Sequence, residues 1–302
     1  MALMSAPSPS RLALVMGVGL AAVSLSAIFI RLADAPGVVV AAYRMVLASL
    51  ILLPWTLRAL KRTPLTRHNV GYAVLAGLLL GVHFATWISS LSFTSVAAST
   101  SLGTTTPVWV ALSSWLVLGF VPSFTALLGM LVAILGGALI GFGGGVAAAS
   151  SAPLVGNLLA LVGAVAAAAY LLLGRAAQNR GLGLQAYIGV AYGVAAISLV
   201  PLPLILGLSY SAYSPNTFFW ILLLALIPQL IGHTSYNYAV KHLDPAVVAT
   251  VILLEPIGAS VLALILFAEI PPLPTLFGAL ILLTGVAITA RNNRDLPAQE
   301  SA

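Results

Sequence analysis

Charged and aromatic side chains inside apolar stretches are the residues of this sequence with the clearest chemical potential. Glu255 precedes Pro256 in "VILLEPIGASVLALILF", and Arg44 follows Tyr43 in "VVVAAYRMVLASL". A charge in hydrocarbon costs about 3 kcal/mol or more, so such residues usually have a functional or pairing role. A buried carboxylate neutralises an ammonium group, carries a proton, or stabilises packing in its neutral form. A buried guanidinium binds a carboxylate or holds helices together.

Two groups of imidazole, aromatic and amide side chains recur at helical spacing. His83 and Trp87 are four residues apart, and so are His233 and Asn237, with Tyr236 next to Asn237. Residues three and four apart share one helix face, and aromatic rings stack on flat substrates while their polar tips orient them. Either histidine is also compatible with a packing role. Because neither a carboxylate nor a thiol accompanies them at ligand spacing, we predict no metal site.

Two prolines predict kinks next to further candidates. Pro107 and Pro256 lack an N–H, which frees a carbonyl one turn earlier and bends the helix. Such kinks line a polar cavity, or neighbouring side chains satisfy the freed groups. Thr106 precedes Pro107, and Trp109 follows it, facing either the cavity or lipid. The predicted substrate-binding residues are Tyr43, Arg44, His83, Trp87, Thr106, Trp109, His233, Tyr236, Asn237 and Glu255.

The composition indicates whether water or lipid surrounds these residues. The chain is 61% hydrophobic and 6% charged, against about 25% charged residues in soluble proteins. It has no cysteine, which excludes disulfides and thiolate catalysis. The N-terminal apolar run imitates a secretory signal, but many apolar segments follow, so we interpret it as a retained first helix. We therefore predict an integral membrane protein.

Solid apolar runs of about 20 residues predict spanning helices and exclude spanning strands. We expect an all-α protein with ten transmembrane helices, and no cofactor. Their approximate ranges are 11–31, 36–58, 69–91, 95–119, 124–142, 153–174, 184–207, 216–239, 246–268 and 272–290.

The basic residues predict the orientation. Ten of them fall on one side if both termini are on that side, whereas Arg31 lies at the opposite face and Arg44 within a helix. The ten are Arg11, Arg58, Lys61, Arg62, Arg67, Arg175, Arg180, Lys241, Arg291 and Arg294. The positive-inside rule then places both termini in the cytoplasm of a bacterial-type cytoplasmic (inner) membrane. Because this charge is spread thinly over a membrane face, we exclude nucleic acid as a partner.

A shift of 149 residues aligns the chain with itself and predicts two repeats, 1–149 and 150–302. The aligned pairs are Pro54 with Pro203, Pro107 with Pro256, Pro122 with Pro271, Gly129 with Gly278, Gly136 with Gly285, and Ala138 with Ala287. Because each repeat holds five helices, an odd number, the second copy must be inverted, an architecture that places substrate near the membrane midplane. The glycine pairs favour close helix packing or a subunit contact. The glycine-rich loop 141–153 lacks the strand and the Gly-Lys of a phosphate loop.

These motifs resemble the EamA family of the drug/metabolite transporter superfamily over essentially the whole chain. The matching elements of the second copy are Tyr236, Ala239, Ala246, Glu255, Pro256, Glu269, Gly278 and Gly285. The first copy keeps Trp87, Leu91, Pro107, Gly129 and Gly136, but has Thr106 and Phe120 at the two acidic positions. Arg44 resembles the arginine of that family's second helix. The resemblance implies export of amino acids, other metabolites or drugs, and the aromatic-rich candidate site is most similar to YddG-type aromatic amino-acid exporters.

The predicted function is therefore secondary export of small metabolites, foremost aromatic amino acids, by alternating access around a midplane cavity. A multidrug or other metabolite exporter on the same fold is the alternative. An intramembrane enzyme is disfavoured, because Glu255 and Glu269 lie about 21 Å apart along one helix and cannot share a proton. We expect Glu269 to cap or pair near the outer membrane edge, with Arg31 as a partner. A homodimer is compatible with the sequence but not required by it.

Overall fold

The structure is entirely helical over the residues that it describes. The computed structural model describes residues 7–118, 123–143, 151–243, 248 and 251–292, and no strand occurs among them. Phe120, Pro122, Ala246, Arg294 and residues 144–150 of the predicted 141–153 loop lie outside this part of the chain. The expectation of an all-α protein is confirmed for the described residues.

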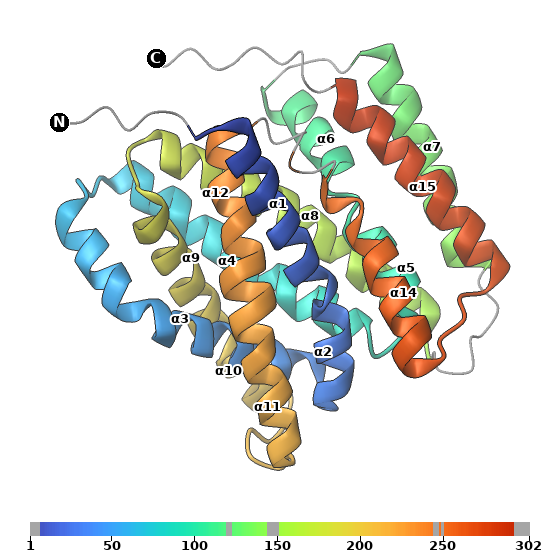
Figure 1. Cartoon of the computed structure of the whole chain (residues 1–302), viewed down its shortest axis with the longest axis horizontal. Helices are drawn as coiled ribbons and strands as arrows, with labels where there is room; N and C mark the ends of the chain where they lie inside the picture. Colours follow the sequence, from blue (N-terminus) through green and yellow to red (C-terminus); the bar gives the residue numbers. More distant parts are fainter. Residues whose placement is uncertain (1–6, 119–122, 144–150, 244–247, 249–250, 293–302) are drawn as a thin grey trace.

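Figure 1 shows the arrangement of the described helices. Their bounds are α1 Pro9–Ser24, α2 Ser26–Ala33, α3 Gly37–Arg62, α4 Arg67–Ser90, α5 Val96–Gly103, α6 Thr106–Leu118, α7 Phe124–Gly143, α8 Pro153–Asn179, α9 Leu184–Leu199, α10 Pro201–Ile205, α11 Pro215–Leu224, the π-helix η1 Ala225–His233, α12 Thr234–His242, α14 Glu255–Phe267 and α15 Leu273–Asn292.

Local sequence signals fix several helix starts. Thr66 and Asn69 form a reciprocal capping box at the start of α4, and the Ser95 hydroxyl accepts from the Ala98 N–H at the start of α5. Such caps satisfy N–H groups that have no partner inside the helix. Pro153 opens α8, where its missing N–H costs nothing.

Six helical runs among the described residues are long and apolar enough to cross a membrane. They are Pro9–Ala33, Gly37–Arg62, Arg67–Ser90, Pro153–Asn179, Leu184–Ile205 and Pro215–His242. Shorter apolar helices occupy Phe124–Ile140, Glu255–Phe267 and Leu273–Thr289. Each of the ten predicted segments overlaps helices of the structure, while the number of spans stays a prediction.

The two predicted kinks are breaks in the structure. α5 ends at Gly103 and α6 begins at Thr106, so the helix is interrupted just before Pro107. In the second half, turn residues Leu253 and Leu254 precede α14, which begins at Glu255. Proline is favourable in the first turn of a helix, so each proline starts a new helix after an interruption instead of bending a continuous one.

α4 lies at the centre of the molecule and packs against α3, α8 and α9. At one side, α7 and α15 form a closely packed pair (Figure 1). Glycines make that contact possible: a Cβ on Gly129 would lie 2.7 Å from the Gly285 carbonyl oxygen, and one on Gly278 would lie 2.8 Å from the Gly136 carbonyl oxygen. The glycine pairs therefore serve helix packing within the chain.

Candidate functional site

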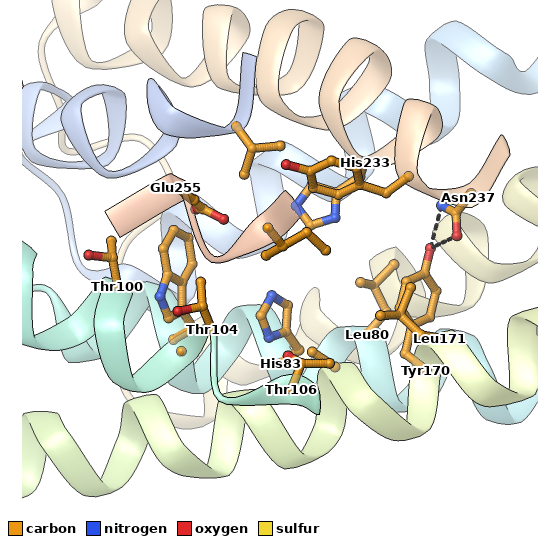
Figure 2. Close-up of a pocket in the computed structure, with 16 residues that line it drawn as sticks. Leu80, His83, Thr100, Thr104, Thr106, Tyr170, Leu171, His233, Asn237 and Glu255 are labelled. Atoms are coloured by element: carbon orange, nitrogen blue, oxygen red, sulfur yellow. Dashed lines mark hydrogen bonds between the residues drawn. The ribbon is translucent and has the colours of Figure 1, made fainter. Parts of the chain in front are cut away.

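A cavity of about 70 Å³ lies between α4, α5, α8, α12 and the starts of α6 and α14 (Figure 2). Seven of the ten predicted substrate-binding residues line it. They are His83, Trp87, Thr106, His233, Tyr236, Asn237 and Glu255. Both halves of the chain supply walls, so the cavity exists only once the two halves are packed together.

Glu255 is the acidic residue of the cavity wall. Its side chain is 7% exposed and it is the first residue of α14. The N-terminus of a helix carries a partial positive charge, which offsets part of the cost of a buried carboxylate. Thr106 is the first residue of α6 and lies 149 positions earlier, at the aligned position of the first half. The cavity therefore has an acid on one broken helix and a hydroxyl on the other.

Imidazole and indole rings line the cavity. The His83 ring lies parallel to the Trp87 ring, with centroids 6.0 Å apart and planes 8° apart. Its Nδ1–H donates to the Gly163 carbonyl oxygen at 2.9 Å. A carbonyl only accepts, so Nδ1 carries a proton, and Nε2 of the neutral ring is an acceptor. The His233 ring lies 6.4 Å from that of His83. Flat apolar faces with polar edges suit a planar ligand.

Trp87 is held in place by close contacts with glycine. A Cβ on Gly103 would lie 2.8 Å from the Trp87 Nε1 atom, and a Cβ on Gly163 would lie 3.0 Å from the Trp87 Cβ. A larger residue at either position would push the indole out of its present site.

Asn237 lines the cavity, and its side chain forms hydrogen bonds with another residue of the protein. The Tyr170 hydroxyl lies 2.9 Å from Asn237 Oδ1 and 2.6 Å from Asn237 Nδ2 (Figure 2). The Asn237 carbonyl oxygen also accepts from Gln178 Nε2 at 3.3 Å. This arrangement makes Asn237 a residue that positions Tyr170 in the wall.

Sequence reasoning missed Tyr170, Thr100 and Thr104, which also line the cavity. Tyr170 is the one large polar side chain in the run "VGAVAAAAYLLLG" of α8, and that isolation was a usable signal. Thr100 and Thr104 are four residues apart and precede the break before Pro107, so their spacing also pointed to one face.

Three predicted site residues lie outside the cavity lining. The Tyr43 hydroxyl donates to the Tyr210 carbonyl oxygen at 2.8 Å, which ties α3 to the segment before α11. Trp109 Nε1 donates to the Thr105 hydroxyl at 3.0 Å. Arg44 is completely buried behind the cavity wall, with Gln229 as its nearest polar partner at 2.8 Å.

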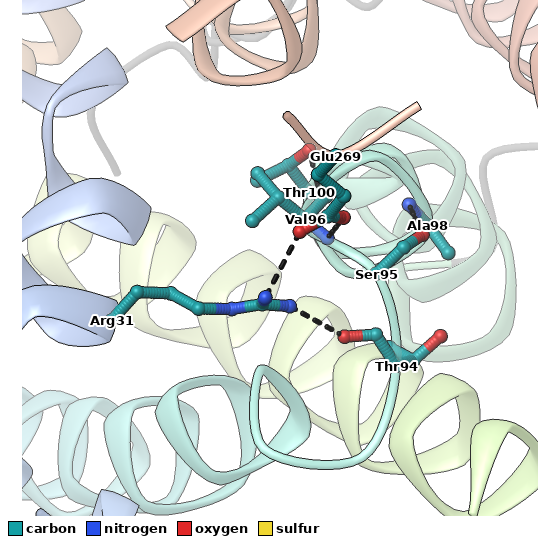
Figure 3. A network of polar contacts seen from close by, with 7 residues as sticks. All are labelled: Arg31, Thr94, Ser95, Val96, Ala98, Thr100 and Glu269. Carbon is teal, nitrogen blue, oxygen red and sulfur yellow. Dashed lines mark hydrogen bonds and ion pairs between the residues drawn. The ribbon is translucent and has the colours of Figure 1, made fainter. Parts of the chain in front are cut away.

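A polar network lies next to the cavity residue Thr100 (Figure 3). Arg31 and Glu269 form an ion pair at 2.9 Å, and Glu269 Oε1 accepts from the Val96 N–H at 2.7 Å. Arg31 also donates to the Thr94 carbonyl oxygen at 3.0 Å. The cavity residue Thr100 donates to the Val96 carbonyl oxygen, so the network begins one helical turn beyond the cavity. The predicted cap and ion pair of Glu269 are confirmed.

Comparison with known proteins shows the protein family. Residues 11–142 and 154–291 match the EamA-like transporter family. An uncharacterized transporter of Archaeoglobus fulgidus is 26% identical over 250 residues, which cover 82% of this chain and 85% of the relative. An uncharacterized transporter of Clostridium kluyveri is 22% identical over 260 residues, covering 82% and 81%.

A solved crystal structure with 17% sequence identity has the same fold. It superposes on 96% of this chain and on 100% of its own length, with a TM-score of 0.65. At that identity the likeness concerns the fold alone.

Proposed function

The chain belongs to the EamA-like transporter family. We propose that it exports small metabolites, foremost aromatic amino acids, across a bacterial-type cytoplasmic membrane. The export is secondary and proceeds by alternating access around the cavity. Ten spanning helices form two inverted five-helix repeats, 1–149 and 150–302, with both termini in the cytoplasm. The observation that carries this proposal is a cavity placed between two helix breaks at aligned positions of the repeats, Thr106 and Glu255.

The packing of the two halves supports an inverted repeat. Gly129 lies against Gly285, and Gly136 lies against Gly278. The alignment by 149 residues exchanges Gly129 with Gly278 and Gly136 with Gly285, so it turns each of these contacts into the other. A twofold relation between antiparallel copies has this property. The same alignment relates α4 to η1 and α12, and α8 to α1. The contact of α4 with α8 therefore corresponds to the contacts of η1 and α12 with α1.

The position of the polar network supports the orientation. Arg31, near the end of α2, meets Thr94 and Glu269, which lie in two connections between helices. The predicted topology places all three residues on the outer side. In this conformation the network joins α2 and α5 to the segment after α14, and it would block passage from that side.

The composition of the cavity supports an aromatic amino acid as the substrate. His83, Trp87 and Tyr236 offer ring faces, and Glu255 offers a negative charge for an ammonium group. The cavity of about 70 Å³ is smaller than the cavity of about 150 Å³ that holds benzene in another protein. An aromatic side chain therefore enters only after the walls separate, as alternating access requires.

A multidrug exporter is the second candidate, favoured by one specific observation. Glu255 is the one carboxylate and no arginine or lysine occurs among the residues that line the described cavity. That combination also suits a lipophilic cation, which carries no carboxylate.

Transport into proteoliposomes distinguishes these candidates. Uptake of labelled phenylalanine would be measured in competition with tryptophan, threonine and a cationic dye. We expect tryptophan to compete best, because its ring matches the aromatic wall. Saturable uptake of the dye, without any uptake of or competition by the amino acids, would establish the multidrug alternative instead.

A further inference from the structure

Arg44 is a buried cation without a carboxylate partner. The residue is 0% exposed, and none of the carboxylates that the structure describes lies within ion-pair distance. Its Nε donates to Gln229 Oε1 at 2.8 Å and its Nη1 to the Ser26 hydroxyl at 3.2 Å. Both acceptors are neutral, so they leave the positive charge uncompensated. An uncompensated charge in a protein interior is costly and favours the binding of an anion.

Two hydrogen-bond donors of this cluster also have no acceptor. Arg44 Nη2 and Gln229 Nε2 are buried and have no hydrogen-bond partner among the described residues. Most buried polar atoms in proteins are paired, so unpaired ones need an explanation. Because Gln229 Oε1 is bound by Arg44, the two free donors belong to one cluster. Two N–H donors beside a positive charge are the features that bind a carboxylate.

The Phe84 ring lies between the Arg44 guanidinium and two residues of the cavity wall. The Arg44 guanidinium lies 4.0 Å from the centroid of the Phe84 ring. The same ring contacts two cavity residues, His83 at 4.9 Å and His233 at 5.2 Å between centroids. A cation–π contact is weaker than a hydrogen-bonded ion pair, so a carboxylate that reaches Arg44 gains by replacing Phe84.

We propose that Arg44 and Gln229 form a carboxylate-binding subsite that joins the cavity when the Phe84 side chain turns aside. The ligand is an α-amino acid whose carboxylate binds this subsite and whose ammonium group binds Glu255. This inference rests on the proposed function and makes it more specific, because it selects zwitterions over simple amines. The displacement of Phe84 also enlarges a cavity that is too small for an aromatic side chain.

Binding to the purified full-length protein tests the subsite with three ligands of similar shape. Phenylalanine carries both charges, 3-phenylpropionate carries only the carboxylate, and phenethylamine carries only the ammonium group. We expect Arg44→Gln to weaken phenylalanine and 3-phenylpropionate about tenfold or more, and to leave phenethylamine unchanged. Glu255→Gln should weaken phenylalanine and phenethylamine and leave 3-phenylpropionate unchanged.

Gln229→Glu is a second variant for the case that Arg44→Gln does not fold. It keeps the side-chain size and supplies Arg44 with an internal carboxylate, so we expect the protein to fold and carboxylate ligands to bind about tenfold or more weakly. Phe84→Leu keeps an apolar side chain but removes the ring from Arg44, and it should strengthen 3-phenylpropionate binding.

The outcomes separate this inference from the proposed function. Equal losses for all three ligands, or unchanged carboxylate binding in Arg44→Gln and Gln229→Glu, would overturn the subsite. So would a wild-type protein that binds neither carboxylate ligand. Arg44-dependent binding of 3-phenylpropionate without any transport of phenylalanine would uphold the subsite and reject amino-acid export.

Discussion

Glu255 is the first residue of α14, so its carboxylate lies at the positive end of a helix. The residues next to it in the sequence do not indicate this position. Glu255 is buried in the wall of a cavity that polar side chains also line, and the positive end of the helix offsets part of the cost of its charge. Thr106 holds the matching place in the first half without a charge. The cavity is thus chemically asymmetric although the two halves align.

Replacement of Glu255 by Gln is expected to lower transport of the substrate about tenfold or more, because the charge that faces the cavity is lost. The initial rate of uptake into proteoliposomes measures the effect. Asp34→Asn is the matched control: the same chemical change falls on an exposed residue with φ 46°, a conformation that asparagine tolerates. Equal rates for wild type and Glu255→Gln would contradict the assignment of Glu255.

Gly103→Ala should impair transport by displacing Trp87. The added Cβ would lie 2.8 Å from the indole Nε1, a distance that forces the ring or the helix end to shift. Because Trp87 forms the cavity wall, we expect a lower uptake rate and a changed tryptophan fluorescence spectrum. Gly71→Ala serves as the control, since a Cβ there meets no atom within 4 Å. Wild-type uptake and spectrum in Gly103→Ala would refute the importance of this contact.

At the scale of elements, interrupted and widened helices build the site. α5 ends and α6 begins at the cavity, and so does α14. The π-helix η1, Ala225–His233, supplies His233 to the cavity wall and Gln229 to Arg44. π-helical turns are rare and are frequent at functional sites. Irregular backbone in a membrane protein is tolerated where it is enclosed by protein or lines a cavity.

The close contact between the regular helices α7 and α15 stabilises the fold, and Gly136→Ala tests this role. The added Cβ would lie 2.6 Å from the Gly278 carbonyl oxygen, so the two helices must separate. We expect the free energy of unfolding to fall by about 1–3 kcal/mol, the usual cost of overpacking. The midpoint of thermal unfolding in detergent measures this change. Gly193→Ala, which meets no atom within 4 Å, should leave the midpoint close to wild type; a similar fall in both variants would argue against a specific contact.

At the scale of the whole molecule, the network around Glu269 ties segments together next to the cavity residue Thr100. Glu269→Gln removes the ion pair with Arg31 and weakens the bond to the Val96 N–H. We expect the outer end to open more often. Because the chain contains no cysteine, Thr104→Cys provides one thiol in the cavity wall, and its labelling by a membrane-impermeant reagent added outside should become several-fold faster.

Arg31→Gln should accelerate this labelling to the same degree, and the double variant should add little, since both changes break one interaction. Arg31→Lys, which keeps the positive charge, is the control. Labelling rates that stay at the wild-type value in Glu269→Gln would exclude a closing role for the network.

The predicted orientation of the chain in the membrane can be tested with reporter fusions. A reporter fused after Ala302 should be active in the cytoplasm, and one inserted after Ser211, between α10 and α11, should be active on the outer side. Paired cytoplasmic and external reporters measure both positions in cells. Activity of both fusions on the same side would contradict the predicted ten-span topology.

The sequence is sufficient to predict that the protein lies in a membrane, that it is helical, and that Pro107 and Pro256 hold equivalent positions. The membrane and the helices follow from the length of the apolar runs, which matches the thickness of the hydrocarbon core. The helix breaks follow from the missing N–H of proline. Both effects depend on residues close together in the chain. The sequence also identified seven of the sixteen residues that line the cavity, because spacing places several of them on single helix faces.

The packing of the helices in three dimensions determines which of those faces meet. It brought His83, His233 and Glu255 to one cavity, placed Arg44 behind Phe84, and added Tyr170 from α8. The structure also showed the expected kinks to be helix ends, because each proline stands in the first turn of a new helix after an interruption. Contacts between segments far apart in the chain depend on helix packing, which periodicity along one helix does not contain.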